Sequence, residues 1–234
     1  MNRLQSELRR LFLLPSPDPG ERLIDAAGQV RAMVMELADP ADWELLSKVW
    51  RGVQLDLELP APAIAVSGLD ALQLWFSLQE PLSALRAAEF LAGLQSRYLA
   101  GLAKPARLRL SPSAAGVFDA ALVPAEQAST GNWSAFVAPD LAPVFADTPW
   151  LDIQPGVEGQ ADLLARLESI KPAAFNAALQ ALRPVGLEAP AQVAKASSAD
   201  LDPRRFLQQV LNDGTVALAL RVEAAKALLG SRQD

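Results

Sequence analysis

Two residue types that carry much of enzyme chemistry are missing from this chain of 234 residues. It has no cysteine and no histidine. Zinc sites, Ser-His-Asp triads, thiolate nucleophiles and disulfides depend on those side chains, so their usual forms are excluded. Acid–base catalysis near neutral pH would need a carboxylate or a lysine with a strongly shifted pKa. The composition therefore favours a protein that is not an enzyme and that has no cofactor.

Long hydrophobic runs are missing as well. No apolar stretch approaches the roughly 18 residues that a membrane-spanning helix needs. The apolar run at residues 11–14 is too short for the hydrophobic region of a secretory signal. These absences predict a cytoplasmic protein that does not associate with membranes. Alanine, leucine and arginine are abundant while lysine occurs only five times, a bias that indicates a bacterial, GC-rich source.

The charge is on the acidic side. The chain has 27 Asp and Glu against 21 Lys and Arg, which gives a net charge of −6. Proteins that bind nucleic acids usually carry a basic surplus, because lysine and arginine contact the phosphates. We therefore expect no tight non-specific binding of DNA or RNA. A protein partner, or self-association, is the expected kind of interaction.

Hydrophobic periodicity between residues 29 and 112 predicts an alternation of strands and helices. Apolar segments at 30–37, 63–66, 72–78 and 107–110 are typical of strands. Asp39-Pro40 and Pro81 with Ser83 are typical of helix starts. The resulting order, β-α-β-β-α-β, is that of ferredoxin-like and RNA-recognition-like (RRM-like) domains. The predicted fold class is α+β, with a ferredoxin-like sheet domain followed by a mostly helical C-terminal region.

Proline, glycine and apolar spacing also divide the chain into parts. The predicted parts are an N-terminal helical arm (1–28), the ferredoxin-like domain (29–125), an extended segment rich in proline and aromatic residues with helices packing on it (126–183), a linker (184–200) and a helical hairpin (201–234). Within the last part, the stretches 205–213 and 220–228 are similar to paired helices of phage packaging proteins and of HEAT-like repeats. An ordinary alanine-rich helical hairpin is the alternative.

One pair of carboxylates could hold a metal ion. Asp56 and Glu58 stand at i and i+2, a spacing that aims both at one face of a strand, and Mg²⁺ takes oxygen ligands. Ser67-Gly68, the strand residues Gln73-Leu74-Trp75 and Glu80-Pro81 follow in order. This pattern resembles the catalytic core of archaeo-eukaryotic-type primases, which is related to the RNA-recognition fold.

The resemblance implies an alternative function, a Mg²⁺-dependent nucleotidyl transferase or a degenerate nucleic-acid-binding relative of one. In that alternative, Asp56 and Glu58 bind the metal. Gln73 contacts the nucleotide, near the position where the family usually has a histidine. The other interpretation treats Asp56 and Glu58 as solvated charges before a proline turn, with no catalytic or metal-binding residue in the chain.

The strand at 72–78 has a second possible use. Alternation places Gln73 and Trp75 on the sheet face away from the two predicted helices, where Arg107 and Arg109 of a neighbouring strand would join them. An exposed aromatic ring beside arginines can stack a base. The alternative is that the aromatic, proline-rich residues 131–156 cover Trp75.

Overall fold

A five-stranded antiparallel sheet lies at the centre of the residues that the computed structural model describes, which are 2–14, 23–102, 104–113 and 120–183. Its strand order is β4-β1-β3-β2-β5. The strands are β1 (Gln29–Ala38), β2 (Ala63–Val66), β3 (Ala71–Ser83), β4 (Leu108–Ser111) and β5 (Ala135–Val137). The structure is thus α+β. The predicted linker and helical hairpin lie outside the described residues.

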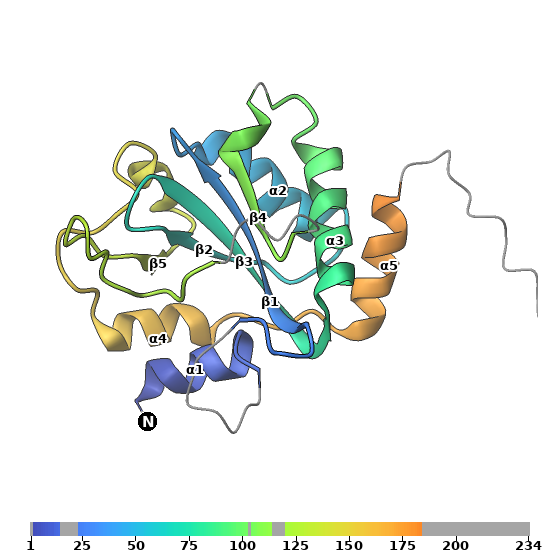
Figure 1. Ribbon diagram of the computed structural model, residues 1–234, viewed down its shortest axis with the longest axis horizontal. Helices are drawn as coiled ribbons and strands as arrows, with labels where there is room; N and C mark the ends of the chain where they lie inside the picture. Colours follow the sequence, from blue (N-terminus) through green and yellow to red (C-terminus); the bar gives the residue numbers. More distant parts are fainter. Residues whose placement is uncertain (1, 15–22, 103, 114–119, 184–234) are drawn as a thin grey trace, which may run out of the picture. The chain divides into compact units, whose positions relative to one another are not determined.

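Helices cover both faces of this sheet (Figure 1). The helical segments are α1 (Arg3–Leu11), α2 (Trp43–Leu55), α3 (Ala84–Tyr98), η1 (Pro105–Arg107), η2 (Ala142–Phe145), α4 (Val157–Ala165) and α5 (Pro172–Leu182). Helices α2, α3 and α5 pack on one face, and α1 and α4 pack on the other. Among the described residues, no helix has the length and apolar character needed to span a bilayer.

Strand β3 shows why the two faces differ. Successive side chains of a strand point to opposite faces. Leu74 and Phe76 therefore pack in the core under α2 and α3, while Trp75 packs in the core under α1 and α4. Residues 71–78 are all buried, because both faces are covered. The extra layer of α1 and α4 therefore leaves residues 71–78 of β3 without a solvent face, while residues 79–81 at the end of the strand are exposed.

The start of α2 differs from the prediction. Asp42, and not Asp39, is the N-cap, and its side chain accepts a hydrogen bond from the backbone N–H of Leu45 at 3.0 Å. Asp39 has φ of 51°, whereas an N-cap residue is normally extended. The chain between β1 and α2 is held by Arg107, which donates to the carbonyl oxygens of Ala38 and Pro40. The Asp-Pro pair is therefore part of a turn.

The other predicted elements are close to the observed ones. Pro81 belongs to the end of β3, and α3 begins at Ala84 without a side-chain cap from Ser83. Residues 120–123 form no helix or strand. The aromatic and proline-rich stretch contributes the edge strand β5, which pairs with β2.

Candidate functional site

Gln73 lies in a row of polar residues that crosses three strands. In the register of the sheet, Gln73 of β3 is opposite Glu36 of β1, and Glu36 is opposite Arg109 of β4. Directly paired residues in adjacent antiparallel strands point to the same face. The three side chains therefore meet on the face that also carries Trp75. We call Glu36, Asp70, Gln73, Trp75 and Arg109 the polar cluster.

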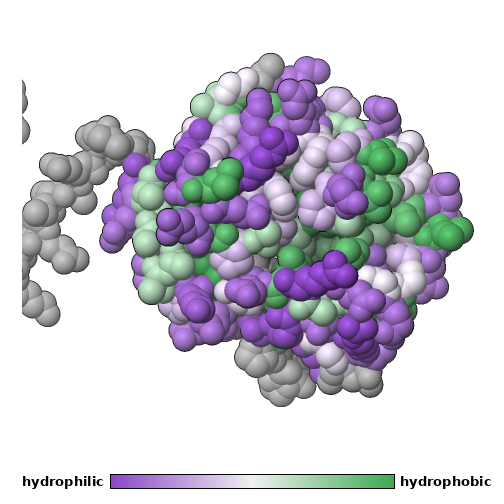
Figure 2. Space-filling model, turned by 180° about the vertical axis from the view of Figure 1, so that it is seen from behind, coloured by the Kyte–Doolittle hydropathy of each residue, from purple (hydrophilic) through white to green (hydrophobic). Residues whose placement is uncertain are grey.

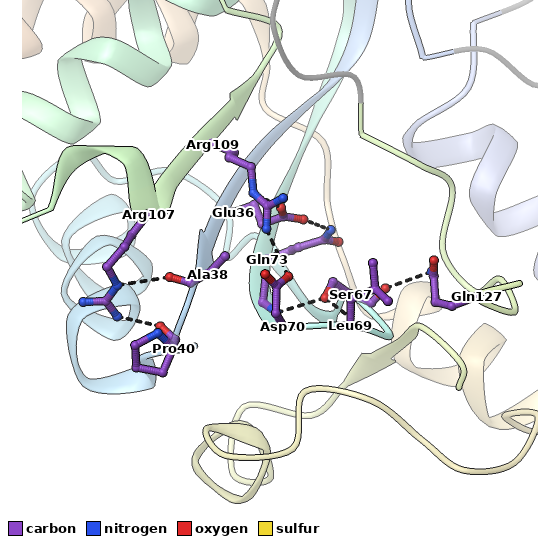
Figure 3. A network of polar contacts seen from close by, with 11 residues as sticks. Glu36, Ala38, Pro40, Ser67, Leu69, Asp70, Gln73, Arg107, Arg109 and Gln127 are labelled. Atoms are coloured by element: carbon purple, nitrogen blue, oxygen red, sulfur yellow. Dashed lines mark hydrogen bonds and ion pairs between the residues drawn. The ribbon is translucent and has the colours of Figure 1, made fainter. Parts of the chain in front are cut away.

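The polar cluster is a continuous chain of contacts, and Figure 3 shows the part of it formed by Glu36, Asp70, Gln73 and Arg109. Trp75 Nε1 donates to Gln73 Oε1 at 2.8 Å, and Gln73 Nε2 donates to Glu36 Oε2 at 2.5 Å. Arg109 Nε lies 2.7 Å from Glu36 Oε1, and Arg109 Nη2 lies 3.0 Å from Asp70 Oδ1. The turn before β3 positions Asp70, because Ser67 Oγ accepts from the N–H groups of Leu69 and Ala71.

The cluster is buried at one end and open at the other. Glu36 and Gln73 are each only 4% exposed, while Arg109 and Asp70 reach the solvent. Burial raises the pKa of the Glu36 carboxyl above its ordinary value. The hydrogen bond from Gln73 and the positive charge of Arg109 lower this pKa, and the charge of Asp70 raises it. Both carboxylate oxygens of Glu36 are occupied by donors from its own sheet.

The predicted metal pair lies elsewhere. Asp56 is the C-cap of α2, where it accepts a hydrogen bond from the Tyr98 hydroxyl at 3.0 Å and lies 3.7 Å from Arg97. Burial, together with this hydrogen bond, raises the pKa of Tyr98 to about 12. Tyr98 belongs to α3, which covers the face opposite to Gln73. Asp56 therefore faces a helix and does not reach the polar cluster.

Glu58 does not complete a site with Asp56. It is exposed and has φ of 52°, so this stretch is a turn after α2 and not the strand that the metal interpretation needs. Among the residues that the structure describes, no three or more Asp or Glu side chains form a group that could hold a metal ion. The prediction that Asp56, Glu58 and Gln73 form one catalytic and metal-binding site is therefore wrong, because the sheet separates Gln73 from Asp56.

The expected stacking surface is also absent at Trp75. Its side chain is 1% exposed and packs between Phe12 and Phe136, with ring centroids 5.3 and 5.9 Å away. Phe136 comes from the aromatic, proline-rich stretch, as the alternative interpretation required, and Phe12 comes from the N-terminal arm. The interpretation of Trp75 as an exposed platform for a base is therefore wrong.

The two arginines predicted beside Trp75 make contacts in different places. Arg109 belongs to the polar cluster, whereas Arg107 binds the backbone carbonyls of Ala38 and Pro40. Only one of them therefore lies near Gln73. Their side chains hold the edge of the sheet together.

Glu36 and Asp70 are the residues that sequence reasoning missed. A signal for Glu36 was present, because it is the only charged residue between Arg31 and Asp39 in a strongly apolar strand. A buried charge of this kind needs a partner. The sequence alone does not say which residue that partner is, because the answer depends on strand register.

Comparison of the chain with known protein families finds no match, and comparison with curated proteins finds none either. The chemistry of the polar cluster therefore has to be inferred from its own geometry.

Proposed function

We propose that the protein is a non-catalytic interaction or scaffold protein. The observation that carries this proposal is the closure of the polar cluster. Glu36 uses both oxygens on Arg109 and Gln73, and Asp70 binds the same guanidinium. A magnesium site needs carboxylate oxygens that converge on one cation. Here the guanidinium of Arg109 lies between the two carboxylates and contacts both of them.

We also propose that the core is ferredoxin-like and a degenerate relative of the primase type. The antiparallel order β4-β1-β3-β2 supports this, together with the chain order of these strands with α2 and α3. Both of these helices pack on the same face of the sheet. In this proposal β5, α1, α4 and α5 are additions to the common core.

A protein partner fits the charge better than a nucleic acid does. The net charge of −6 opposes contact with phosphates. Arg107 and Arg109, the arginines expected beside a base, are held by groups of the protein itself. We therefore propose a protein ligand and a cytoplasmic location for this protein, and no tight binding of single-stranded DNA or RNA at physiological salt.

A nucleotidyl transfer assay tests the non-catalytic proposal. The full chain is incubated with nucleoside triphosphates, a single-stranded template and Mg²⁺ or Mn²⁺, and the products are separated by gel electrophoresis. We expect no product, and no heat of Mg²⁺ binding by calorimetry. Product that is lost in Glu36→Gln and retained in Glu58→Gln, a matched change at an exposed carboxylate, would show that the cluster is a working site and would overturn the proposal.

A further inference from the structure

One long stretch of the chain carries charge of a single sign. Between Arg109 and Arg166 the sequence has no lysine or arginine, but it has seven Asp or Glu residues. Asp140, Asp147 and Asp152 are exposed and form no ion pair with any residue that the structure describes. Their charges are therefore available to an outside partner.

Exposed hydrophobic side chains alternate with these aspartates. Six large hydrophobic side chains are exposed among the described residues, and three of them are Leu141, Val144 and Ile153, at 50%, 69% and 74%. Figure 2 shows that hydrophobic groups are interspersed with hydrophilic ones on the face that it draws. These exposed residues lie within one stretch of the chain, 140–153, and we call Asp140, Leu141, Val144, Asp147, Asp152 and Ile153 the acidic apolar surface.

The backbone of this stretch is anchored to the sheet, which favours a preformed surface. Leu151 exchanges two backbone hydrogen bonds with Trp133, at 2.8 and 3.0 Å. The carbonyl oxygen of Pro149 accepts from Gly68 N at 3.0 Å, and Ala142 of η2 is fully buried. A partner would therefore find the backbone of this surface already held in place, which lowers the entropic cost of binding.

We propose that the acidic apolar surface is the docking site for a basic segment of another protein, with apolar anchor residues between its lysines or arginines. This inference rests on the proposed function and names the chemistry of its partner. The apolar residues supply buried area, and the aspartates supply selectivity for a basic segment. A second copy of the chain is disfavoured, because a two-fold contact would bring the same acidic residues face to face.

A binding assay with a defined probe tests the inference. The probe is a fluorescein-labelled synthetic helix of leucine and lysine at helical spacing, and its counterpart has glutamate in place of lysine. Fluorescence anisotropy with the full chain should show saturable binding of the basic probe only. We expect Asp140→Asn/Asp147→Asn/Asp152→Asn to weaken binding about tenfold, as loss of complementary charges does.

Two matched controls isolate the surface from the overall charge. Glu58→Gln/Glu80→Gln/Glu168→Gln changes the net charge equally at other exposed sites and should weaken binding about twofold or less, because charges distant from the contact are screened. Val144→Ser/Ile153→Ser should weaken binding, whereas Leu55→Ser/Leu85→Ser, at equally exposed positions, should not. Circular dichroism of each variant confirms that it is folded.

Three outcomes would overturn the inference. The first is no binding of the basic probe, and the second is equal weakening by the surface variants and their controls. The third is a dimer, detected by analytical ultracentrifugation, that the surface variants dissociate, because the occupant would then be a second copy. These outcomes are independent of the nucleotidyl transfer assay, so failure of the docking site and failure of the non-catalytic proposal can be told apart.

Discussion

The side-chain amide of Gln160 pairs with both backbone polar atoms of Phe136. Gln160 Oε1 accepts from Phe136 N at 2.8 Å, and Gln160 Nε2 donates to Phe136 O at 2.9 Å. Phe136 lies on β5, one of the two edge strands of the five-stranded sheet. Unpaired edge groups are a template for pairing with another chain. The amide of α4 thus takes the position that a peptide group of a further strand would occupy.

Replacing this amide should destabilise the protein. Gln160→Leu keeps most of the side-chain volume but leaves two buried backbone groups of Phe136 without partners, which costs about 1–3 kcal/mol. Urea unfolding measures the loss. Gln180→Leu, at an exposed position of α5, is the control and should change the stability little. Equal stability of Gln160→Leu and the unmodified protein would show that the contact contributes nothing.

The buried carboxyl of Glu36 should make the stability depend on pH. Its pKa in the folded protein lies above the ordinary value of 4.5, so the folded state binds this proton more tightly than the unfolded chain does. The resulting stabilisation is fully present below pH 4.5 and is lost as the pH rises through the folded-state pKa. Relative to Glu36→Gln, the free energy of unfolding should therefore fall as the pH increases above 4.5.

Urea unfolding at a series of pH values measures this difference. Glu58→Gln, at an exposed carboxyl, provides the reference for the same chemical change outside the cluster. An unfolding free energy of the unmodified protein that rises relative to that of Glu36→Gln with increasing pH would contradict the assigned direction. It would mean that Arg109 and Gln73 outweigh the effect of burial.

Arg109 should stabilise the protein mainly by pairing with the negative charge of the buried Glu36 carboxylate. Arg109→Met leaves that buried carboxylate without its ion pair, and we expect a loss of about 1–3 kcal/mol near neutral pH, because the arginine is partly exposed. In a Glu36→Gln background the same substitution should cost much less. A double-mutant cycle from urea unfolding gives the coupling. Additive effects of the two substitutions would show that the pair is not coupled.

Replacing Gly52 by alanine should lower the stability of the protein, although Gly52 lies inside a helix. Alanine is favoured over glycine there by about 1 kcal/mol in intrinsic propensity. A Cβ at position 52 would overlap the ring of Tyr98, whose hydroxyl is held by Asp56. We therefore expect Gly52→Ala to destabilise the protein by about 1–3 kcal/mol, as overpacking does.

Thermal and urea unfolding of two further variants test this explanation. Gly159→Ala in α4 has no heavy atom within 4 Å of the added Cβ, so it should stabilise the protein slightly. In a Tyr98→Ala background, Gly52→Ala should become neutral or favourable. Destabilisation that persists without the ring would mean that Tyr98 is not the obstacle.

The helices and strands of the first half of the chain were largely predictable, because they follow from local periodicity. The segments expected at 63–66 and 72–78 lie within β2 and β3, and the strand expected at 30–37 lies within β1. Boundaries were less certain where several residues could act as caps. Asp39 and Asp42 both suit an N-cap by type, and the left-handed backbone of Asp39 decided between them.

The candidate site was predictable only in part. Gln73 was identified from the sequence, but its acidic partners were sought at Asp56 and Glu58, its near neighbours along the chain. The partner that the structure supplies is Glu36, 37 positions away, because the register of β1 against β3 brings the two side chains together. Register depends on the packing of the whole sheet, which no local pattern encodes.

Composition and local pattern by themselves determined that cysteine and histidine chemistry is excluded, that the chain is acidic, and where the central strands run. Only the tertiary structure decided what those strands face. Alternation placed Trp75 on the second face of the sheet, but Phe12 and Phe136 had to arrive from distant parts of the chain to bury it. Burial is a property of the assembled layers, so alternation could place Trp75 on a face of the sheet, but only the packing of distant segments decided that this face is part of the core.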